Sequence, residues 1–353
     1  MKPIRVAGCD PGTSSLDVLL LENGAVADQA RFSPEQLRID PSLPVSWLVD
    51  RGPLDLVAGP SGYGLPLVRA ADCTEREFAL MSLVRPDERG RAGGVAGFSA
   101  VVRAFAAAPL PVVFLPGVIH LPTVPAHRKI NRIDLGTPDK LCVAALAVER
   151  LAAERGGYAD CHCCAIELGT VFTACVVSHG GRIVDGLGGT SGPVGWGGPG
   201  AWDGEAAYLL SPLAKGDLFA GGAAAAAGEV QHHRGLRESL VKAVMGLQAL
   251  TPFETIFLSG QLFETVPDLF NQVREDFDNC GGVRRLSSLP GARVKHAAQG
   301  AAILADGLAG GKHAPLVGHL RLREAAGTVL DWLRHPRADA VRAAFGIPPG
   351  PRP

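Results

Sequence analysis

The stretch GCDPGTSSLDVLLLENG, residues 8–24, places an acid, glycines and three small hydroxyl residues between two apolar runs. The run IRVAG before the acid indicates a buried strand, and LDVLLLENG predicts a second strand that ends in an Asn-Gly turn. We therefore interpret residues 10–15 as the tight loop of a β-hairpin. Taken alone, the loop is explained equally well as an ordinary turn, because turns favour Asp, Pro and Gly.

A second copy of this pattern, CAIELGTVFTACVVSHGGRIVDG, begins at Cys164. A gapless shift of 157 residues aligns Asp10 with Glu167, Gly12 with Gly169 and Thr13 with Thr170. Two copies are too few for a solenoid, so the similarity predicts two similar domains, each opening with such a loop. Facing loops of this kind would cradle a polyphosphate, and the two acids would hold a hydrated divalent cation.

Size and charge restrict the class of protein. The chain has 353 residues, of which 47% are hydrophobic and 20% charged, and its net charge is −1. These values are typical of a folded two-domain protein and give no electrostatic reason to expect a nucleic-acid or membrane partner. The start, MKPIRVAGCDPG, lacks the apolar stretch of a signal peptide, and no apolar run is long enough to span a bilayer. We expect a cytoplasmic protein.

The cluster CHCC, residues 161–164, is a candidate metal site only at first sight. Its spacing is not CxxC, and it runs directly into the strand-like AIEL, so alternate side chains point to opposite faces. We interpret these cysteines as small apolar strand residues and expect no zinc.

Strand-like and helix-like segments alternate along the chain, which favours an α/β fold. The predicted strands are 4–8, 16–21, 54–58, 112–115, 164–168, 173–178 and 255–258. The predicted helices are 98–108, 139–155, 236–249, 264–278, 295–309 and 319–334. We place the domain junction in ERGGYADCH, residues 154–162.

Three further segments are candidates for binding. In NRIDLGTPDKLC, Thr137 and Pro138 fit the first residues of a helix, and Arg128, Lys129 and Arg132 crowd that end and favour an anion site. The Gly-rich residues 186–205 contain two tryptophans, which are unusual in a plain linker. In TIFLSGQLFE, residues 255–264, a strand–Gly–helix turn would let the backbone approach a ligand. The small-residue helix from residue 295 predicts close helix packing.

The order of these pieces resembles the superfamily of acetate and sugar kinases, heat-shock ATPases and actin. The resemblance implies two similar actin-like (ribonuclease H-like) α/β domains with a nucleotide cleft between them, with ATP and Mg²⁺ bound there. The implied domains are 1–156 and 157–311, followed by C-terminal helices and a tail at 312–353. The implied metal ligands are Asp10 and Glu167. The implied nucleotide-binding residues are Gly12, Thr13, Ser14 and Ser15 in a first phosphate loop, Gly169, Thr170 and Thr173 in a second, and Ser259, Gly260 and Gln261 in an adenosine motif.

Within that superfamily the chain looks most like the acetate and butyrate kinase branch, including a family labelled predicted butyrate kinase. The segment VVFLPGVIHLPTVP, residues 112–125, resembles an acetate kinase segment that reads VFDTAFHQTMP. Where that branch has its catalytic Asp, this chain has Leu115, Pro116 and Gly117, and where it has a His before Gly-Thr, this chain has Leu135. Its active-site Arg has no clear match in residues 192–200.

Replacements for the missing groups gather near the third loop, and the predicted catalytic residues are Asp10, His120, Arg132, Asp134 and Lys140. If the acceptor is a hydroxyl, Asp134 would take its proton. If the acceptor is a carboxylate, Arg132 or Lys140 would orient it. We expect an ATP-dependent small-molecule kinase, with a short carboxylate as one acceptor. The alternatives are an ATPase that drives conformational change in a partner, or a nucleotide-binding protein without catalysis. Whether a homodimer forms is left open.

Overall fold

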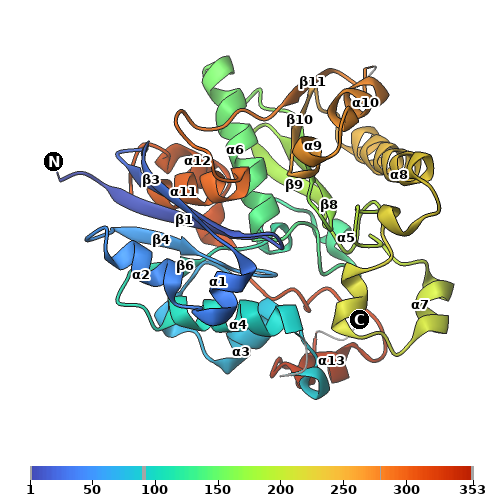
Figure 1. Ribbon diagram of the computed structural model, residues 1–353, viewed down its shortest axis with the longest axis horizontal. Helices are drawn as coiled ribbons and strands as arrows, with labels where there is room; N and C mark the ends of the chain where they lie inside the picture. Colours follow the sequence, from blue (N-terminus) through green and yellow to red (C-terminus); the bar gives the residue numbers. More distant parts are fainter. Residues whose placement is uncertain (1, 90–92, 279, 351–353) are drawn as a thin grey trace.

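The computed structural model describes residues 2–89, 93–278 and 280–350, and its elements form two α/β halves around two mixed sheets (Figure 1). The N-terminal sheet has the order β3-β2-β1-β4-β6-β5. Its strands are β1 (Arg5–Pro11), β2 (Leu16–Glu22), β3 (Ala25–Phe32), β4 (Leu56–Gly59), β5 (Val68–Arg69) and β6 (Val112–Phe114). The predicted hairpin is confirmed, since β1 pairs antiparallel with β2. Asn23 and Gly24 turn the chain into β3 with φ of 50° and 75°, as a tight hairpin turn requires.

The C-terminal sheet repeats the same construction in the order β11-β10-β7-β8-β9. Its strands are β7 (Cys163–Leu168), β8 (Thr173–His179), β9 (Arg182–Leu187), β10 (Thr255–Ser259) and β11 (Gly282–Arg285). The bounds of β8 lie 157 residues after those of β2. A register shift falls between Leu20 and Leu21 in one half and between Val177 and Ser178, the same distance on, in the other. The repeat read from the sequence is therefore a structural repeat.

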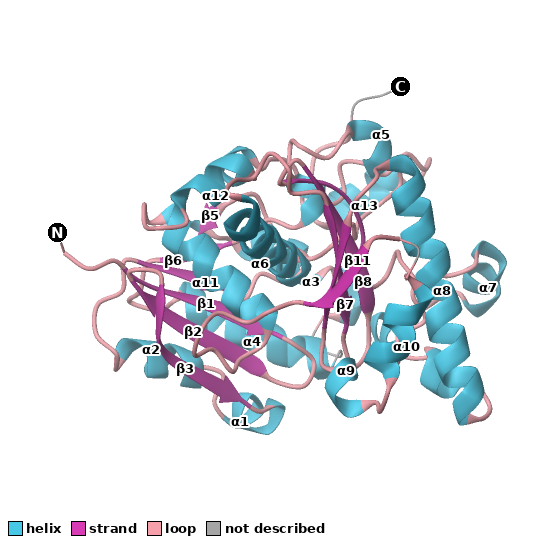
Figure 2. Cartoon of the chain, turned by 90° about the horizontal axis from the view of Figure 1, so that it is seen from above, coloured by secondary structure: helices cyan, strands magenta, loops and turns pink. Residues whose placement is uncertain are grey.

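Helices cover the sheets, and two of them form the layer between the halves. The helices of the N-terminal half are α1 (Pro34–Ile39), α2 (Leu43–Val49), α3 (Glu75–Ser82), α4 (Gly93–Ala106), α5 (Ala126–Lys129) and α6 (Pro138–Arg155). Those that follow are α7 (Gly204–Leu210), α8 (Glu229–Leu250), α9 (Leu262–Thr265), α10 (Leu269–Asp276), α11 (His296–Leu308), α12 (Ala314–His319) and α13 (Ala338–Ala344). Figure 2 shows α6 and α11 between the sheets, where α11 packs on β1 and α6 packs on β7 and β8.

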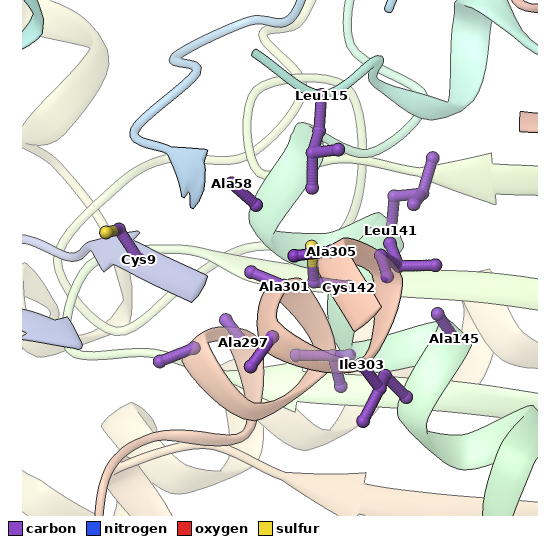
Figure 3. Packing of buried hydrophobic residues seen from close by; sticks show 14 of the residues in the cluster. Cys9, Ala58, Leu115, Leu141, Cys142, Ala145, Ala297, Ala301, Ile303 and Ala305 are labelled. Atoms are coloured by element: carbon purple, nitrogen blue, oxygen red, sulfur yellow. The ribbon is translucent and has the colours of Figure 1, made fainter. Parts of the chain in front are cut away.

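Small residues let α11 approach both α6 and β1 very closely (Figure 3). A Cβ added to Gly300 on α11 would lie 1.9 Å from the carbonyl oxygen of Cys142 on α6. A Cβ added to Gly8 on β1 would lie 2.0 Å from the backbone nitrogen of Ala302. The close packing predicted for the helix from residue 295 is thus confirmed.

Two helix predictions are wrong. Residues 319–334 were predicted as a helix, but after α12 the chain forms only the short 3₁₀ turn Leu322–Glu324 and irregular turns. Arg321 and Gly327 have φ of 53° and 79°, outside the helical range, and the Asp331 carboxylate accepts the Thr328 N–H at 2.7 Å in a local turn. Residues 264–278 were predicted as one helix, but Pro267 lies in the break between α9 and α10.

The cysteines behave as apolar residues. Among the residues the structure describes, all eight are free thiols, and no group of three His, Cys, Asp or Glu side chains is arranged to hold a metal ion. Cys163 and Cys164 on β7 belong to different hydrophobic clusters, which confirms that alternate side chains point to opposite faces of the sheet. No helix in the described ranges is long and apolar enough to cross a membrane.

Candidate active site

The two predicted phosphate loops face each other and touch. The first connects β1 to β2, and the second connects β7 to β8. The hydroxyl of Thr13 lies 2.9 Å from the hydroxyl of Thr170, its equivalent in the repeat. The contact therefore joins equivalent residues of the two repeated hairpins. The hydroxyl of Ser14 also donates to the Gln261 side chain at 2.7 Å. Residues from both loops and from the predicted adenosine motif are therefore joined by direct hydrogen bonds.

The turn after β10 packs against the second loop through a glycine. Gly260 has φ of 118°, and a Cβ there would lie 2.1 Å from the Leu168 carbonyl oxygen, so no other residue fits. Ser259 is buried beside Glu167 in the sheet register, and its hydroxyl lies 2.8 Å from Nδ1 of His296. Burial lowers the pKa of His296 to about 4, so its ring is neutral. This neutral ring fixes Ser259 of the predicted adenosine motif through that hydrogen bond.

Other predicted loop residues differ in how they are engaged. The Ser15 hydroxyl donates to Asp17 at 2.6 Å, which fixes the loop to β2. The Thr173 hydroxyl is buried and has no hydrogen-bond partner in the structure. Gly169 closes its own loop through a hydrogen bond from its N–H to the Phe172 carbonyl at 2.9 Å. Unpaired buried hydroxyls such as that of Thr173 are rare in folded proteins.

Asp10 is a buried acid near the end of β1. It lies beside Lys295, which was not among the site residues predicted from the sequence. The ammonium of Lys295, at the start of α11, lies 3.7 Å from the Asp10 carboxylate and donates to the Ser15 carbonyl at 2.9 Å. Gly12 makes room for it, because a Cβ there would lie 2.3 Å from Lys295 Nζ. Burial raises the pKa of Asp10 to about 7, although Lys295 lowers it. The ammonium group of Lys295 therefore lies against the first loop.

Lys140 on α6 supplies a second cation to the same cluster. Its ammonium donates to Asp139 at 2.8 Å and to Glu167 at 3.0 Å. Burial alone would lower the pKa of Lys140, but the two carboxylates outweigh it and raise that pKa. The charges of Asp139 and Glu167 also raise the pKa of Asp10. The cluster therefore brings the carboxyl groups of Asp10, Asp139 and Glu167 together with two ammonium groups.

The cluster fits a hydrated divalent cation. Oε2 of Glu167 is buried with no hydrogen-bond partner, and Asp10 is an acid whose ionised form lacks full compensation. Mg²⁺ retains water ligands and commonly needs only one or two protein carboxylates beside a phosphate group. Asp10 and Glu167 are the acids placed to supply them.

A pocket of about 480 Å³, open to solvent, is lined by residues other than those of the cluster. Six of its polar lining residues are Tyr63, Arg85, Arg132, Asp134, Thr190 and Lys215. The buried Asp134 carboxylate accepts hydrogen bonds from the Thr190 N–H at 3.0 Å, the Thr190 hydroxyl at 2.9 Å and the Gly136 N–H at 3.1 Å. Burial outweighs these bonds and raises the pKa of Asp134, and the nearby charge of Asp139 raises it further. Asp134 therefore lines the pocket and interacts electrostatically with Asp139 of the cluster.

Some predicted residues lie outside this arrangement. His120 is buried, and its charged neighbours are Lys129 and Asp331 rather than the acids of the cluster; burial lowers its pKa to about 4. Lys129 donates to the Leu121 carbonyl at 2.9 Å, and Arg128 pairs with Asp185 at 3.3 Å. Of the basic residues predicted to form an anion site at the start of α6, Arg132 lines the pocket.

Comparison with solved structures identifies the class of this fold. A propionate kinase from Francisella tularensis superposes with a TM-score of 0.55 over 85% of this chain and 99% of its own, at 13% identity. An acetate kinase from Entamoeba histolytica gives 0.51 over 78% and 87%, at 10% identity. The chain thus shares the overall fold of these acetate and propionate kinases.

The family within that fold follows from the sequence match. Residues 8–335 match the family described as protein of unknown function DUF1464. The chain belongs to that family. Among curated proteins no match is found.

Proposed function

We propose that this chain is an ATP-dependent kinase that phosphorylates a small molecule. The observation that carries the proposal is the hydrogen bond between Thr13 and Thr170, which brings two equivalent hydroxyl-bearing loops together. A carboxylate–lysine cluster borders these loops, and Asp134, a buried acid that interacts electrostatically with Asp139 of the cluster, lines a pocket. Phosphoryl transfer needs this combination, because it depends mainly on positioning and charge neutralisation.

The hydroxyls, the lysines and the acids of the site each have a separate proposed role. The hydroxyls of Thr13 and Thr170 would exchange their mutual hydrogen bond, and Ser14 its bond to Gln261, for bonds to phosphate oxygens. Lys295 and Lys140 would neutralise charge as it develops on the transferred group. Asp10 and Glu167 would hold Mg²⁺, which supplies further neutralisation of the phosphate oxygens when bound.

Asp134 is the residue placed to act on the acceptor. Its carboxylate borders the pocket, and its raised pKa brings it closer to the working pH, as suits a group that accepts a proton. The resemblance to carboxylate kinases predicts a short acid as acceptor, for which no base is required. The position of Asp134 supports a hydroxyl acceptor instead.

The test is ADP release from Mg²⁺-ATP by the purified chain, with ATP affinity measured separately by calorimetry. Asp10→Asn is expected to lower acceptor-dependent ADP release by roughly 100-fold or more. Asp50→Asn, at the exposed end of α2, is the matched control and should retain the wild-type rate. Activity of Asp10→Asn within threefold of wild type would refute the proposal, as would ADP release that no acceptor accelerates.

A further inference from the structure

The first hairpin carries a second buried acid, Asp17, directly across the strands from Asp10. The register of β1 and β2 pairs these two residues, and Asp17 is 0% exposed. Like charges opposite each other in an antiparallel pair are destabilising, and a buried charge is costly unless it is paired. The repeat shows that the fold does not require this acid, because its equivalent in the second hairpin is Ala174, a buried residue opposite Glu167. A role specific to the first hairpin must therefore account for Asp17.

The Asp17 carboxylate contacts both ends of Lys295. Its Oδ2 accepts a hydrogen bond from the backbone N–H of Lys295 at 3.0 Å, and its Oδ1 lies 3.8 Å from the Lys295 ammonium. Oδ1 also accepts the Ser15 hydroxyl at 2.6 Å, and the Ser15 carbonyl accepts from that same ammonium at 2.9 Å. One carboxylate thus fixes the start of α11, the side chain of Lys295 and the loop residue to which this side chain bonds.

Arg31 on β3 supplies the main counter-charge of Asp17. It donates to Oδ2 of Asp17 at 3.0 Å and to Oδ1 at 3.2 Å, and its side chain is 57% exposed. Burial alone would raise the pKa of Asp17, but hydrogen bonds from Arg31 and Ser15 and the charge of Lys295 outweigh burial and lower that pKa. Because Arg31 balances the negative charge of Asp17, this acid orients Lys295 without fully cancelling its positive charge.

The segment that leads into Lys295 is tied to the same hairpin by a glutamine. The Gln29 side chain on β3 accepts the Arg293 N–H at 2.6 Å and the Val294 N–H at 3.3 Å. Residues 293–295 come after β11 of the C-terminal sheet, yet they bond to β2 and β3 of the N-terminal sheet. Lys295 is thus held on the first hairpin, although its place in the chain assigns it to the other half.

We propose that Asp17 is a positioning residue that holds the Lys295 ammonium against the first phosphate loop, where it binds a phosphate group of the nucleotide. The proposal rests on the nucleotide binding that the kinase function above assumes. Asp17 is wholly buried and acts through Lys295. The sign of one effect separates positioning from simple charge. Neutralising an acid that acts only through its charge strengthens the binding of a nearby anion, whereas losing a positioning residue weakens it.

The experiment measures the affinity of the full chain for the non-hydrolysable ATP analogue AMP-PNP with Mg²⁺, by calorimetry. Lys295→Met should weaken binding roughly tenfold or more, because a charge-assisted hydrogen bond is lost. Asp17→Asn should weaken binding roughly three- to tenfold when Lys295 is present. In the Lys295→Met background the same substitution should leave the affinity unchanged or slightly raise it. Asp50→Asn removes the same charge at the exposed end of α2 and, as the matched control, should bind like wild type.

Gln29→Ala is the second variant, for the case that Asp17→Asn does not fold in thermal unfolding. It changes no charge, and it should weaken binding about two- to fivefold, again only where Lys295 is present; unchanged binding would then overturn the proposal.

The possible failures are distinguishable. Unchanged or tighter binding by folded Asp17→Asn, or an equal loss with and without Lys295, would overturn the positioning role and leave the kinase function standing. The expected binding losses without any acceptor-dependent ADP release would overturn the kinase function and support the positioning role. A wild-type chain that does not bind the analogue would overturn both.

Discussion

Asp10 gives the sharpest test of the site, because the same side chain should weaken the fold and enable the chemistry. It is 4% exposed, and burial raises its pKa from 3.8 to about 7. An acid with a raised folded-state pKa releases its proton more readily in the unfolded chain. Between these two pKa values stability therefore falls as the pH rises, by about 1.4 kcal/mol per pH unit.

The size of the effect follows from that shift. Above pH 7 the full penalty is about 4 kcal/mol, and about 3 kcal/mol of it develops between pH 5 and pH 8. Asp10→Asn keeps the shape of the side chain and removes the titration. We expect this variant to be more stable than wild type at pH 8, with a much smaller gain at pH 5.

Urea unfolding of both proteins at pH 5 and pH 8 measures this directly. The difference between the two stability differences reports the titration of Asp10 together with its effect on its charged neighbours Lys295, Asp139 and Glu167. The electrostatic description of the cluster would be refuted if the stability gain of Asp10→Asn over wild type were the same at both pH values. A smaller gain at pH 8 than at pH 5 would refute it too. A gain in stability combined with lost ADP release would be the signature of a site kept strained for function.

Three further substitutions probe the packing and the loops. Lys140→Met leaves two carboxylates unpaired and should cost about 3–5 kcal/mol, more at pH 8 than at pH 5, in the same urea assay; equal losses at both pH values would contradict this. Gly300→Ala should cost about 3 kcal/mol in thermal or urea unfolding, since its Cβ meets backbone at 1.9 Å; Gly235→Ala on α8, with open space around it, is the control and should not destabilise. Thr13→Val should weaken ATP binding roughly five- to tenfold by calorimetry, and unchanged affinity would argue against the loop as a phosphate site.

The repeated hairpin was predictable because its information is local. The strand-like runs and the Asn-Gly turn lie within short stretches of sequence. The constant offset of 157 residues between the two copies predicts that Thr13 and Thr170 occupy equivalent places. The glycine after β10 and the small residues of α11 were equally readable, since only they permit close backbone approach.

The pocket as a whole and Lys295 were not predictable in the same way, whereas Asp134, Arg132 and Lys140 were singled out from the sequence. Tyr63, Asp134, Trp202 and Lys215 come from segments far apart in the chain, and no local pattern marks any of them as a partner of the others. Lys295 stands before a helix that is fully explained by packing, so nothing local distinguishes it from a surface lysine. The predicted helix at 319–334 failed for the opposite reason, because its local pattern is helical and turns at Arg321 and Gly327 override it.

The two cluster lysines also show why the halves act as one site. Lys140 stands on α6, which precedes the second hairpin, and its ammonium bonds Glu167 of that second hairpin. Lys295 stands before α11, which follows the second hairpin, and its ammonium lies beside Asp10 of the first. Each connecting helix thus delivers a cation to the loop of the other half. In the proposed kinase, a phosphate chain that binds between the loops would displace the Thr13–Thr170 hydrogen bond and would offer both lysines an anionic partner.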